Sequence, residues 1–386
     1  MSSQQTSDLS VYEEEETNMN DKKSGMTYSE IGSFFWLGDA KGNESGRKGI
    51  REWLPDVADE TYTFSGRSSI DLALQDIIAT GGAKSAYLPA YLCDSMVQPF
   101  KDHNIDIHYY KVWFQNGRFV YEYDPDHGCD IVLIMSYFGL DTKNELDAIR
   151  ELKKNGAIII EDLTHSLLCK EAYSVYTDYY VCALRKCLEI PTGGWVGKKD
   201  GTLHNKPYKE SDPLVETKIR GMYEKYDYIT GKTDTKQVFW DDQSQLEEYL
   251  DRVDHMLKID STSHELLNSM DVCSIAAKRK KNAEVLRNAL KDLDGSVLQL
   301  PELDLTGDVP LFIPVFLENA QRNSLRKYLI ENNVYCPVHW PEVEGAPVSV
   351  AGEELSLICD QRYGESDMMV IASLVHAWAH VIAPRI

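Results

Sequence analysis

From about residue 63 onward, apolar and polar positions alternate between a pattern typical of strands and one typical of helices. Residues 130–137 form a continuous apolar run, as expected of a strand buried on both faces. In residues 68–80 the apolar positions recur at helical spacing and end at a Gly-Gly stop. The same reasoning predicts strands at 85–88, 105–110, 157–160, 179–184 and 195–197, and helices at 95–103 and 141–155. Strands separated by helices indicate β-α-β units and a mostly parallel sheet over about residues 60–200.

The remaining chain predicts three other parts around a large domain at 25–206. Residues 1–24 are polar and acidic, which is typical of a disordered tail. Residues 207–294 are charged and helix-rich, so they are expected to form a connecting segment. Residues 295–386 predict a small α+β domain of alternating strands and helices. Its predicted elements are strands at 311–316, 334–338 and 355–359, and helices at 320–332 and 366–381.

Charge and cysteine usage exclude several classes of protein. The 386 residues include 40 Lys and Arg against 62 Asp and Glu, a net charge of −22. This balance disfavours a nucleic-acid binder, which needs a basic face, and a protein that docks on anionic lipid. No apolar run reaches the ~18 residues of a membrane-spanning helix. The eight cysteines form no C-x-x-C pair, so we expect reduced thiols in a cytoplasmic protein without a metal site.

Charged residues follow several predicted strands at the edge where parallel sheets bind ligands. The strand at 157–160 is followed by E-D-L-T-H-S, which holds Asp162 and His165. The strand at 179–184 is followed by R-K and then by G-G, which places Lys186 at the same edge. The run F-S-G-R-S opens the helix at 68–80. One crevice is therefore expected to receive an acid, a histidine, a lysine and a helix N-terminus.

Each of these features suits one part of the same cofactor. A carboxylate such as Asp162 can keep a pyridine nitrogen protonated, and the ring then accepts electrons. A lysine such as Lys186 can condense with an aldehyde to give a Schiff base. Free N–H groups at the helix start, Ser65 to Ser68, can bind a phosphate. Aldehyde, pyridine and phosphate together indicate pyridoxal 5′-phosphate (PLP).

The order S-G-R, L-P-x-Y, Y-F-G, E-D-x-x-H-S, L-R-K and G-G resembles the fold type I PLP-dependent aminotransferases, in particular the DegT/DnrJ/StrS sugar aminotransferases. The resemblance covers about residues 30–386. It implies an α/β fold whose large domain has a mostly parallel, seven-stranded-type sheet flanked by helices, with a small C-terminal α+β domain. It also implies a homodimer that moves an amino group from a small-molecule donor to a keto or aldehyde acceptor, with a sugar among the candidates.

The resemblance implies a role for each matching residue. Lys186 would carry the cofactor and act as general base, Asp162 would contact the pyridine nitrogen, and His165 would lie by the ring hydroxyl. The serine that the family places before the lysine is missing, and Arg67 or Arg185 would replace it in binding phosphate. The candidate cofactor-binding residues are Ser65, Gly66, Arg67, Ser68, Tyr91, Asp162, His165, Arg185 and Lys186, and the candidate substrate-binding residues are His339 and Arg362.

Every candidate also has a structural alternative. The alternatives are a helix cap for Asp162 and for Ser65 to Ser68, a structural hydrogen bond for His165, a solvated basic pair for Arg185 and Lys186, core packing for Tyr91, boundary packing for His339, and an ion pair of Arg362 with Asp360 or Glu365. Two alternatives for the whole protein also stay open. One is a PLP enzyme of another reaction, such as a dehydratase or lyase, and the other is a non-catalytic relative with a binding or regulatory role.

Overall fold

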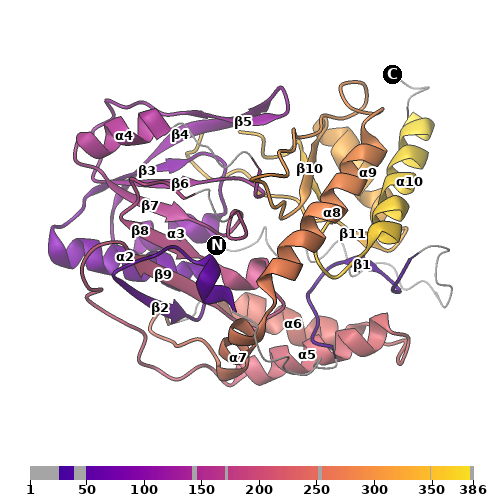
Figure 1. Ribbon diagram of the computed structural model, residues 1–386, viewed down its shortest axis with the longest axis horizontal. Coiled ribbons are helices and arrows are strands. Elements are labelled where there is room, and N and C mark those ends of the chain that lie inside the picture. The colour runs from indigo at the N-terminus through magenta and orange to yellow at the C-terminus, as the bar shows by residue number, and fades with distance from the viewer. Residues whose placement is uncertain are drawn as a thin grey trace.

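The computed structural model describes residues 26–38, 49–140, 146–169, 173–250, 254–347 and 349–382. Within these residues, a large sheet of eight strands lies on one side of the molecule and a smaller part with short strands on the other (Figure 1). The strand order in the large sheet is β2-β9-β8-β7-β6-β3-β4-β5. The strands are β2 (Asp59–Thr63), β3 (Ser85–Pro89), β4 (Asp106–Gln115), β5 (Arg118–Glu122), β6 (Ile131–Met135), β7 (Ile158–Asp162), β8 (Tyr179–Cys182) and β9 (Gly194–Lys198).

The direction of the strands confirms the predicted α/β class with a mostly parallel sheet. Strands β4, β3, β6, β7 and β8 run parallel to one another, whereas β5, β9 and β2 pair antiparallel at the two ends of the order. Eight strands replace the predicted seven-stranded type. Strand β2 and the β4–β5 hairpin were not predicted from the sequence. That hairpin turns at Asn116 and Gly117, both with positive φ (52° and 78°), as an Asn-Gly turn requires.

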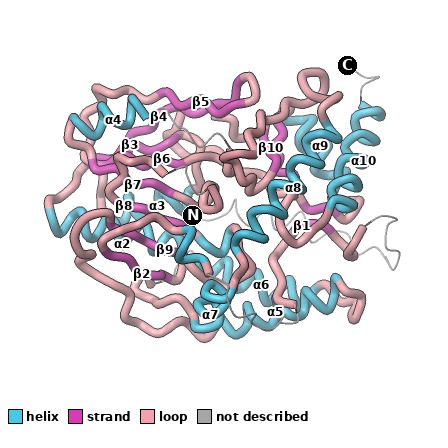
Figure 2. The backbone as a smooth tube through the Cα atoms, viewed as in Figure 1, coloured by secondary structure: helices cyan, strands magenta, loops and turns pink. Residues whose placement is uncertain are grey.

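Helices from the crossover connections pack against the large sheet. They are α2 (Gly66–Thr80), α3 (Asp94–Asp102) and α4 (Leu146–Lys154). Figure 2 distinguishes these helices from the strands by colour. Every residue of β6 is buried, as its continuous apolar run predicts. The first part of the predicted helix at 141–155 lies outside the described residues, and its last part corresponds to α4.

The middle of the chain is helical, and the C-terminal part combines strands with helices. The helices of the middle segment are α5 (Leu214–Ile229), α6 (Gln237–Leu250), α7 (Ser261–Ser269) and α8 (Val272–Leu290). The C-terminal elements are β10 (Ile313–Phe316), α9 (Asn319–Ile330), β11 (Val334–Tyr335), β12 (Glu354–Leu357) and α10 (Glu365–Ile382). Strands β10 and β12 pair antiparallel. None of the helices described is long and apolar enough to cross a membrane.

Two segments from earlier in the chain, β1 (Ile31–Gly32) and α8, pack with the C-terminal part. Strand β1 pairs parallel with β11, and the Gly32 N–H donates to the Tyr363 hydroxyl at 2.8 Å. Helix α8 shares one hydrophobic core with β10, β12 and α10, and Figure 1 shows it extending toward α10. A helical pattern shows which face is apolar, but it does not identify the element that covers that face. The boundaries at 206 and 294 stay a prediction.

Candidate functional site

The ends of two neighbouring parallel strands, β7 and β8, bring the predicted residues together. Asp162 is the last residue of β7, one position inside the strand rather than after it, and it pairs with Met135 of β6 and Val181 of β8. His165 lies in the turn that follows β7. Lys186 ends the short helix η2 (Leu184–Lys186), which follows β8 directly. Because these strands are parallel, their carboxyl ends form one edge of the sheet, as the sequence predicts.

Asp162 is buried, with 4% of its surface exposed. Its Oδ1 accepts a hydrogen bond from the Thr164 N–H at 2.7 Å, so a local capping contact is present. Burial raises the pKa of Asp162 to about 6, against the hydrogen bonds from Thr164, and no cation is among the groups that shift it. A buried carboxyl held in this way is suited to contact a positively charged ligand.

His165 lies beside the lysine and is neutral. Its Nδ1 accepts the Phe138 N–H at 3.1 Å, which places the ring hydrogen on Nε2. Burial, and then the charge of Lys186, lowers the pKa of His165 to about 3. The imidazole ring is stacked with Trp340, with the centroids 5.3 Å apart. Lys186 follows the neighbouring strand β8, so its charge acts on the imidazole from the same edge of the sheet.

The predicted phosphate site is a capped helix N-terminus packed against the lysine loop. Ser65 Oγ accepts the Ser68 N–H at 3.2 Å, which is the capping alternative, and Arg67 Nη1 donates to the Leu250 carbonyl at 3.0 Å. A Cβ added at Gly66 would lie 2.6 Å from the Cβ of Ala183. Glycine is therefore required for the close approach of α2 to the loop that leads to Lys186.

Tyr91 and His339 belong to an aromatic cluster that includes His165 and Trp340. The Tyr91 hydroxyl donates to the His339 carbonyl, and its ring lies 5.1 Å from that of Trp340. The His339 and His165 rings are 5.6 Å apart. His339 Nδ1 also shares a hydrogen bond with Ser356 Oγ at 2.9 Å. Core packing of Tyr91 and boundary packing of His339 are thus both present. His339 lies beside His165, and Tyr91 lies beside Trp340.

Arg362 forms the ion pair with Asp360 that the sequence analysis left open. Its Nε and Nη2 donate to the two carboxylate oxygens of Asp360 at 2.9 and 2.7 Å. Its Nη1 donates to the Phe34 carbonyl at 2.9 Å, and the guanidinium carbon lies 4.2 Å from the centroid of the Phe35 ring. The forked face of Arg362 is thus engaged within the chain. Its role in substrate binding stays a prediction.

Lys186 opens into a cavity of about 330 Å³ between the sheet edge, α5, α6 and the C-terminal part. On the cavity wall, Glu247 accepts hydrogen bonds from Arg185 at 2.8 Å and from Lys218 at 3.1 Å. Arg185 and Lys186 therefore do not form a solvated pair, since Arg185 is held by Glu247. Lys218 and Glu247 were not predicted from the sequence, because charged residues on long helices are usually solvated.

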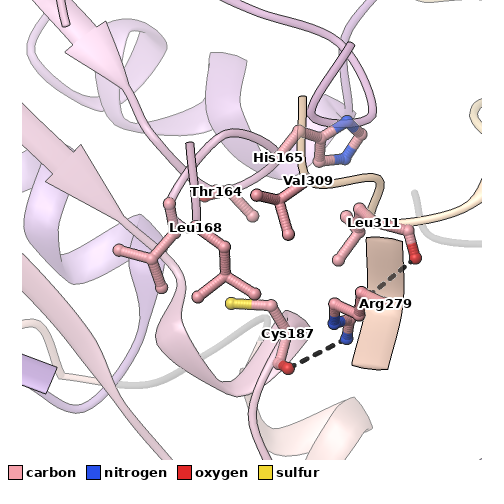
Figure 3. Close-up of a pocket in the computed structure, with 8 residues that line it drawn as sticks. Thr164, His165, Leu168, Cys187, Arg279, Val309 and Leu311 are labelled. Carbon is pink, nitrogen blue, oxygen red and sulfur yellow. Dashed lines mark hydrogen bonds between the residues drawn. The ribbon is translucent and has the colours of Figure 1, made fainter. Parts of the chain in front are cut away.

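Arg279 of α8 is a third residue of the cavity that was not predicted from the sequence. It is 1% exposed and donates to the carbonyls of Leu311 at 2.9 Å and Cys187 at 3.1 Å, the two bonds drawn in Figure 3. The space around it in that view, which Thr164 and His165 also line, has no measurable free volume. Arg279 also lines the larger cavity beside Lys186. Its position in a charged helical stretch carried no signal of this burial.

No family model matches the chain, and no curated protein matches its sequence. Solved structures do match its fold. The aminotransferase TlmJ from Streptoalloteichus hindustanus is 15% identical with a TM-score of 0.55, over 86% of this chain and 89% of TlmJ. NtdA from Bacillus subtilis, with the cofactor PMP bound, is 14% identical with a TM-score of 0.54, over 83% of this chain and 73% of NtdA.

A DegT/DnrJ/EryC1/StrS aminotransferase from Brucella abortus is 13% identical with a TM-score of 0.52, over 83% of this chain and 86% of that one. Similarity at these identities is informative about the fold. The resemblance noted in the sequence is therefore confirmed at the level of architecture. This chain has the fold of the fold type I aminotransferases.

Proposed function

We propose that the protein is a PLP-dependent aminotransferase, which moves an amino group from an amino donor to a keto or aldehyde acceptor. One observation carries the proposal. Asp162, His165 and Lys186 meet at one edge of the parallel sheet, in a fold that solved aminotransferases share. The buried Asp162 carboxyl has no cation among the groups that shift its pKa, so it is suited to a pyridinium nitrogen.

The residues at this edge fit PLP. Lys186 would hold the aldehyde carbon, Asp162 the pyridine nitrogen, and the Nε2 hydrogen of His165 the ring hydroxyl. The start of α2 from Ser65 to Ser68, with Arg67 or Arg185, would bind the phosphate, and Tyr91 would contact the ring. When bound, the cofactor supplies an aldehyde that takes up the amino group and a ring that accepts electrons.

The chain's own residues would perform the proton transfers. Once an amino donor has displaced it, the Lys186 amine would act as the general base at the substrate carbon. Asp162 would hold the proton on the pyridine nitrogen, because a buried carboxylate stabilises a positive charge beside it. The neutral His165 would act as a hydrogen-bond donor. Trp340, stacked on His165, would help to exclude water.

The finer parts of the proposal are the substrates, the assembly and the compartment. His339 and Arg362 would face the substrate, because both lie where the C-terminal part meets the sheet edge. The resemblance supports a homodimer. The eight cysteines are free in the structure, and reduced thiols support a cytoplasmic location. A sugar stays one of the candidate acceptors.

The test is to add PLP to the purified protein and record visible absorbance. Borohydride reduction should then fix the cofactor to the peptide that contains Lys186, detected by mass spectrometry. Lys186→Ala should abolish the label, whereas the control Lys154→Ala, on the exposed surface of α4, should retain it. A label on Lys170 or Lys198 would contradict the assignment of the lysine.

An amino donor separates the alternatives. An aminotransferase should convert the bound cofactor to the pyridoxamine form in one half-reaction, which changes the absorbance. A lyase or dehydratase should release its product without that conversion. A protein that stays colourless after PLP is added would instead favour the non-catalytic relative.

A further inference from the structure

The cavity beside Lys186 contains an excess of positive charge. It has a volume of about 330 Å³ and lies where the sheet edge, the helices α5 and α6, and the C-terminal part meet. Its charged lining residues are the cations Arg185, Lys186, Lys218, Arg279 and Arg362 and the carboxylates Glu247 and Asp360. An excess of cations remains when Lys186 is set aside, as it must be if its amine carries a cofactor.

The internal ion pairs do not neutralise this excess. Asp360 is matched by Arg362, since the two form a forked pair. Glu247 is shared by two cations, Arg185 and Lys218. Although burial alone would raise the pKa of Glu247, these cations hold it well below its usual range, so Glu247 carries one full negative charge against two positive ones. One positive charge on this wall is therefore left over.

Arg279 is a further buried cation without a hydrogen-bonded carboxylate. Its two terminal nitrogens donate to the backbone carbonyls of Pro310, Leu311 and Cys187, and the carboxyls of Glu189 and Asp360 act on it only electrostatically. Among the residues that the structure describes, its buried Nε has no hydrogen-bond partner. Burying a guanidinium is unfavourable unless an anion is close to it. A bound anion would supply a directly hydrogen-bonded partner.

Aromatic rings form another part of the cavity lining. Phe34 and Trp240 lie with their ring centroids 5.2 Å apart, and Lys218 Nζ lies 5.0 Å from the Phe34 centroid. Phe35 and Phe312 also line the cavity. An apolar, planar group would gain ring contacts there while an attached anion reached the cations.

The volume indicates a small ligand. At about 330 Å³ the cavity lies near the lower limit of ordinary ligand pockets. A nucleotide-linked sugar would extend beyond it.

From the cavity's charge, rings and size we propose that it binds a small carboxylate with a planar apolar side chain, of the class of aromatic amino acids and 2-oxo acids. The carboxylate contacts Lys218 and Arg279, and the planar group packs against Phe34 and Trp240. The inference rests on the proposed function in one respect, which is that this ligand would be the amino donor or acceptor at Lys186. Binding itself requires no cofactor.

The test is isothermal titration calorimetry with 3-phenylpropionate, which carries the ring and the carboxylate but neither an amino nor a keto group. The full chain is titrated with and without PLP. Binding of 3-phenylpropionate is expected, whereas the uncharged 3-phenylpropanol should bind at least roughly tenfold more weakly, as loss of a charged hydrogen bond predicts. Thymidine diphosphate serves as the probe for a nucleotide-linked substrate.

Two variants locate the ligand. Lys218→Met should weaken 3-phenylpropionate binding at least roughly tenfold and leave 3-phenylpropanol binding unchanged. Trp240→Leu should weaken both. The control is Lys232→Met, which removes an exposed lysine just beyond the end of α5 and should change neither. Thermal unfolding of each variant verifies that the fold is retained.

The outcomes separate this inference from the proposed function. Tighter binding of thymidine diphosphate than of 3-phenylpropionate overturns the inference, and so does unchanged 3-phenylpropionate binding in a folded Lys218→Met variant. If borohydride reduction still fixes PLP to Lys186 in either case, the proposed function stands although the inference fails. Binding of 3-phenylpropionate that depends on Lys218, in a protein that never takes up PLP, supports the inference and contradicts the proposed function.

Discussion

Asp162 and Asp360 are two buried aspartates at the candidate site, and their surroundings shift their pKa values in opposite directions. Asp360 is 2% exposed and receives both arms of Arg362, which lowers its pKa even though burial alone would raise it. Asp162 is 4% exposed, accepts a backbone N–H from Thr164, and has its pKa raised to about 6 by burial. One carboxylate is neutralised within the chain, and the other lacks a cationic partner among the groups that shift its pKa.

The difference distinguishes a structural charge from a functional one. A buried ion pair holds two segments in one arrangement, and here the pair also links to the N-terminal segment through the Phe34 carbonyl. A buried carboxyl with no nearby cation destabilises the fold, which is acceptable where a ligand supplies the charge. Variants at the two positions should therefore affect different properties of the protein.

The largest effect is expected from Asp360→Asn. The amide keeps the shape of the side chain but leaves Arg362 buried without its counter-charge, so the free energy of unfolding should fall by about 3–5 kcal/mol. Urea unfolding followed by circular dichroism measures this change. A loss below about 1 kcal/mol would show that the pair does not stabilise the fold.

Asp162→Asn should lower activity instead of stability. Loss of the pyridinium partner should reduce turnover by about 100- to 1000-fold, as removal of one preorganised electrostatic contact does in other enzymes. The free energy of unfolding should stay within about 1 kcal/mol of the original or rise. Steady-state kinetics with PLP in excess, together with cofactor retention on a desalting column, test both parts. Full activity in the variant would refute the role of Asp162.

The pH dependence of the free energy of unfolding, measured for the same variant, tests the comparison further. The folded-state pKa of Asp162 is raised to about 6 from 3.8, so the folded protein holds the proton more tightly than the unfolded chain. Stability must then fall as pH rises from about 4 to 6, by up to about 3 kcal/mol. In cofactor-free protein, the original should lose stability relative to Asp162→Asn between pH 4.5 and 7.5. A difference of the opposite sign, measured by urea unfolding, would contradict the assigned shift.

The smallest effect is expected from Arg362→Lys. Lysine keeps the charge but loses the two-armed contact with Asp360, so the free energy of unfolding should fall by about 1 kcal/mol. The KM for an amino donor is measured in parallel. A tenfold rise in KM with the cofactor still bound would support the predicted contact with substrate. An unchanged KM would show that Arg362 pairs with Asp360 and does not contact the substrate.

The sequence predicted the large sheet well because its strands are short, apolar and separated by helices. The positions of Asp162, His165 and Lys186 at one edge follow from that order, since each comes at or just after the end of a parallel strand. The antiparallel β2 and β9 were harder to foresee, because pairing direction is set by the route of the chain rather than by local pattern. The Asn116-Gly117 pair, in contrast, is a typical hairpin signal, so the β4–β5 hairpin could have been predicted from the sequence.

The cavity could not be predicted in the same way. Lys218, Glu247 and Arg279 lie on three different helices, α5, α6 and α8. In sequence each resembles a charge on a solvated helix face, and only tertiary packing brings the three together. Trp340 and His339 likewise reach His165 from a segment far along the chain.

Strand β1 has a consequence for the order in which the protein takes shape during synthesis. Ile31 pairs with Val334, so β1 must wait for about 300 residues to be translated. At roughly 5–20 residues per second, that delay lasts about 15–60 s. The sheet that holds Asp162 and Lys186 has left the ribosome well before then. The edge that would bind the cofactor can therefore fold first, while the wall formed by Phe34 and Phe35 is completed last.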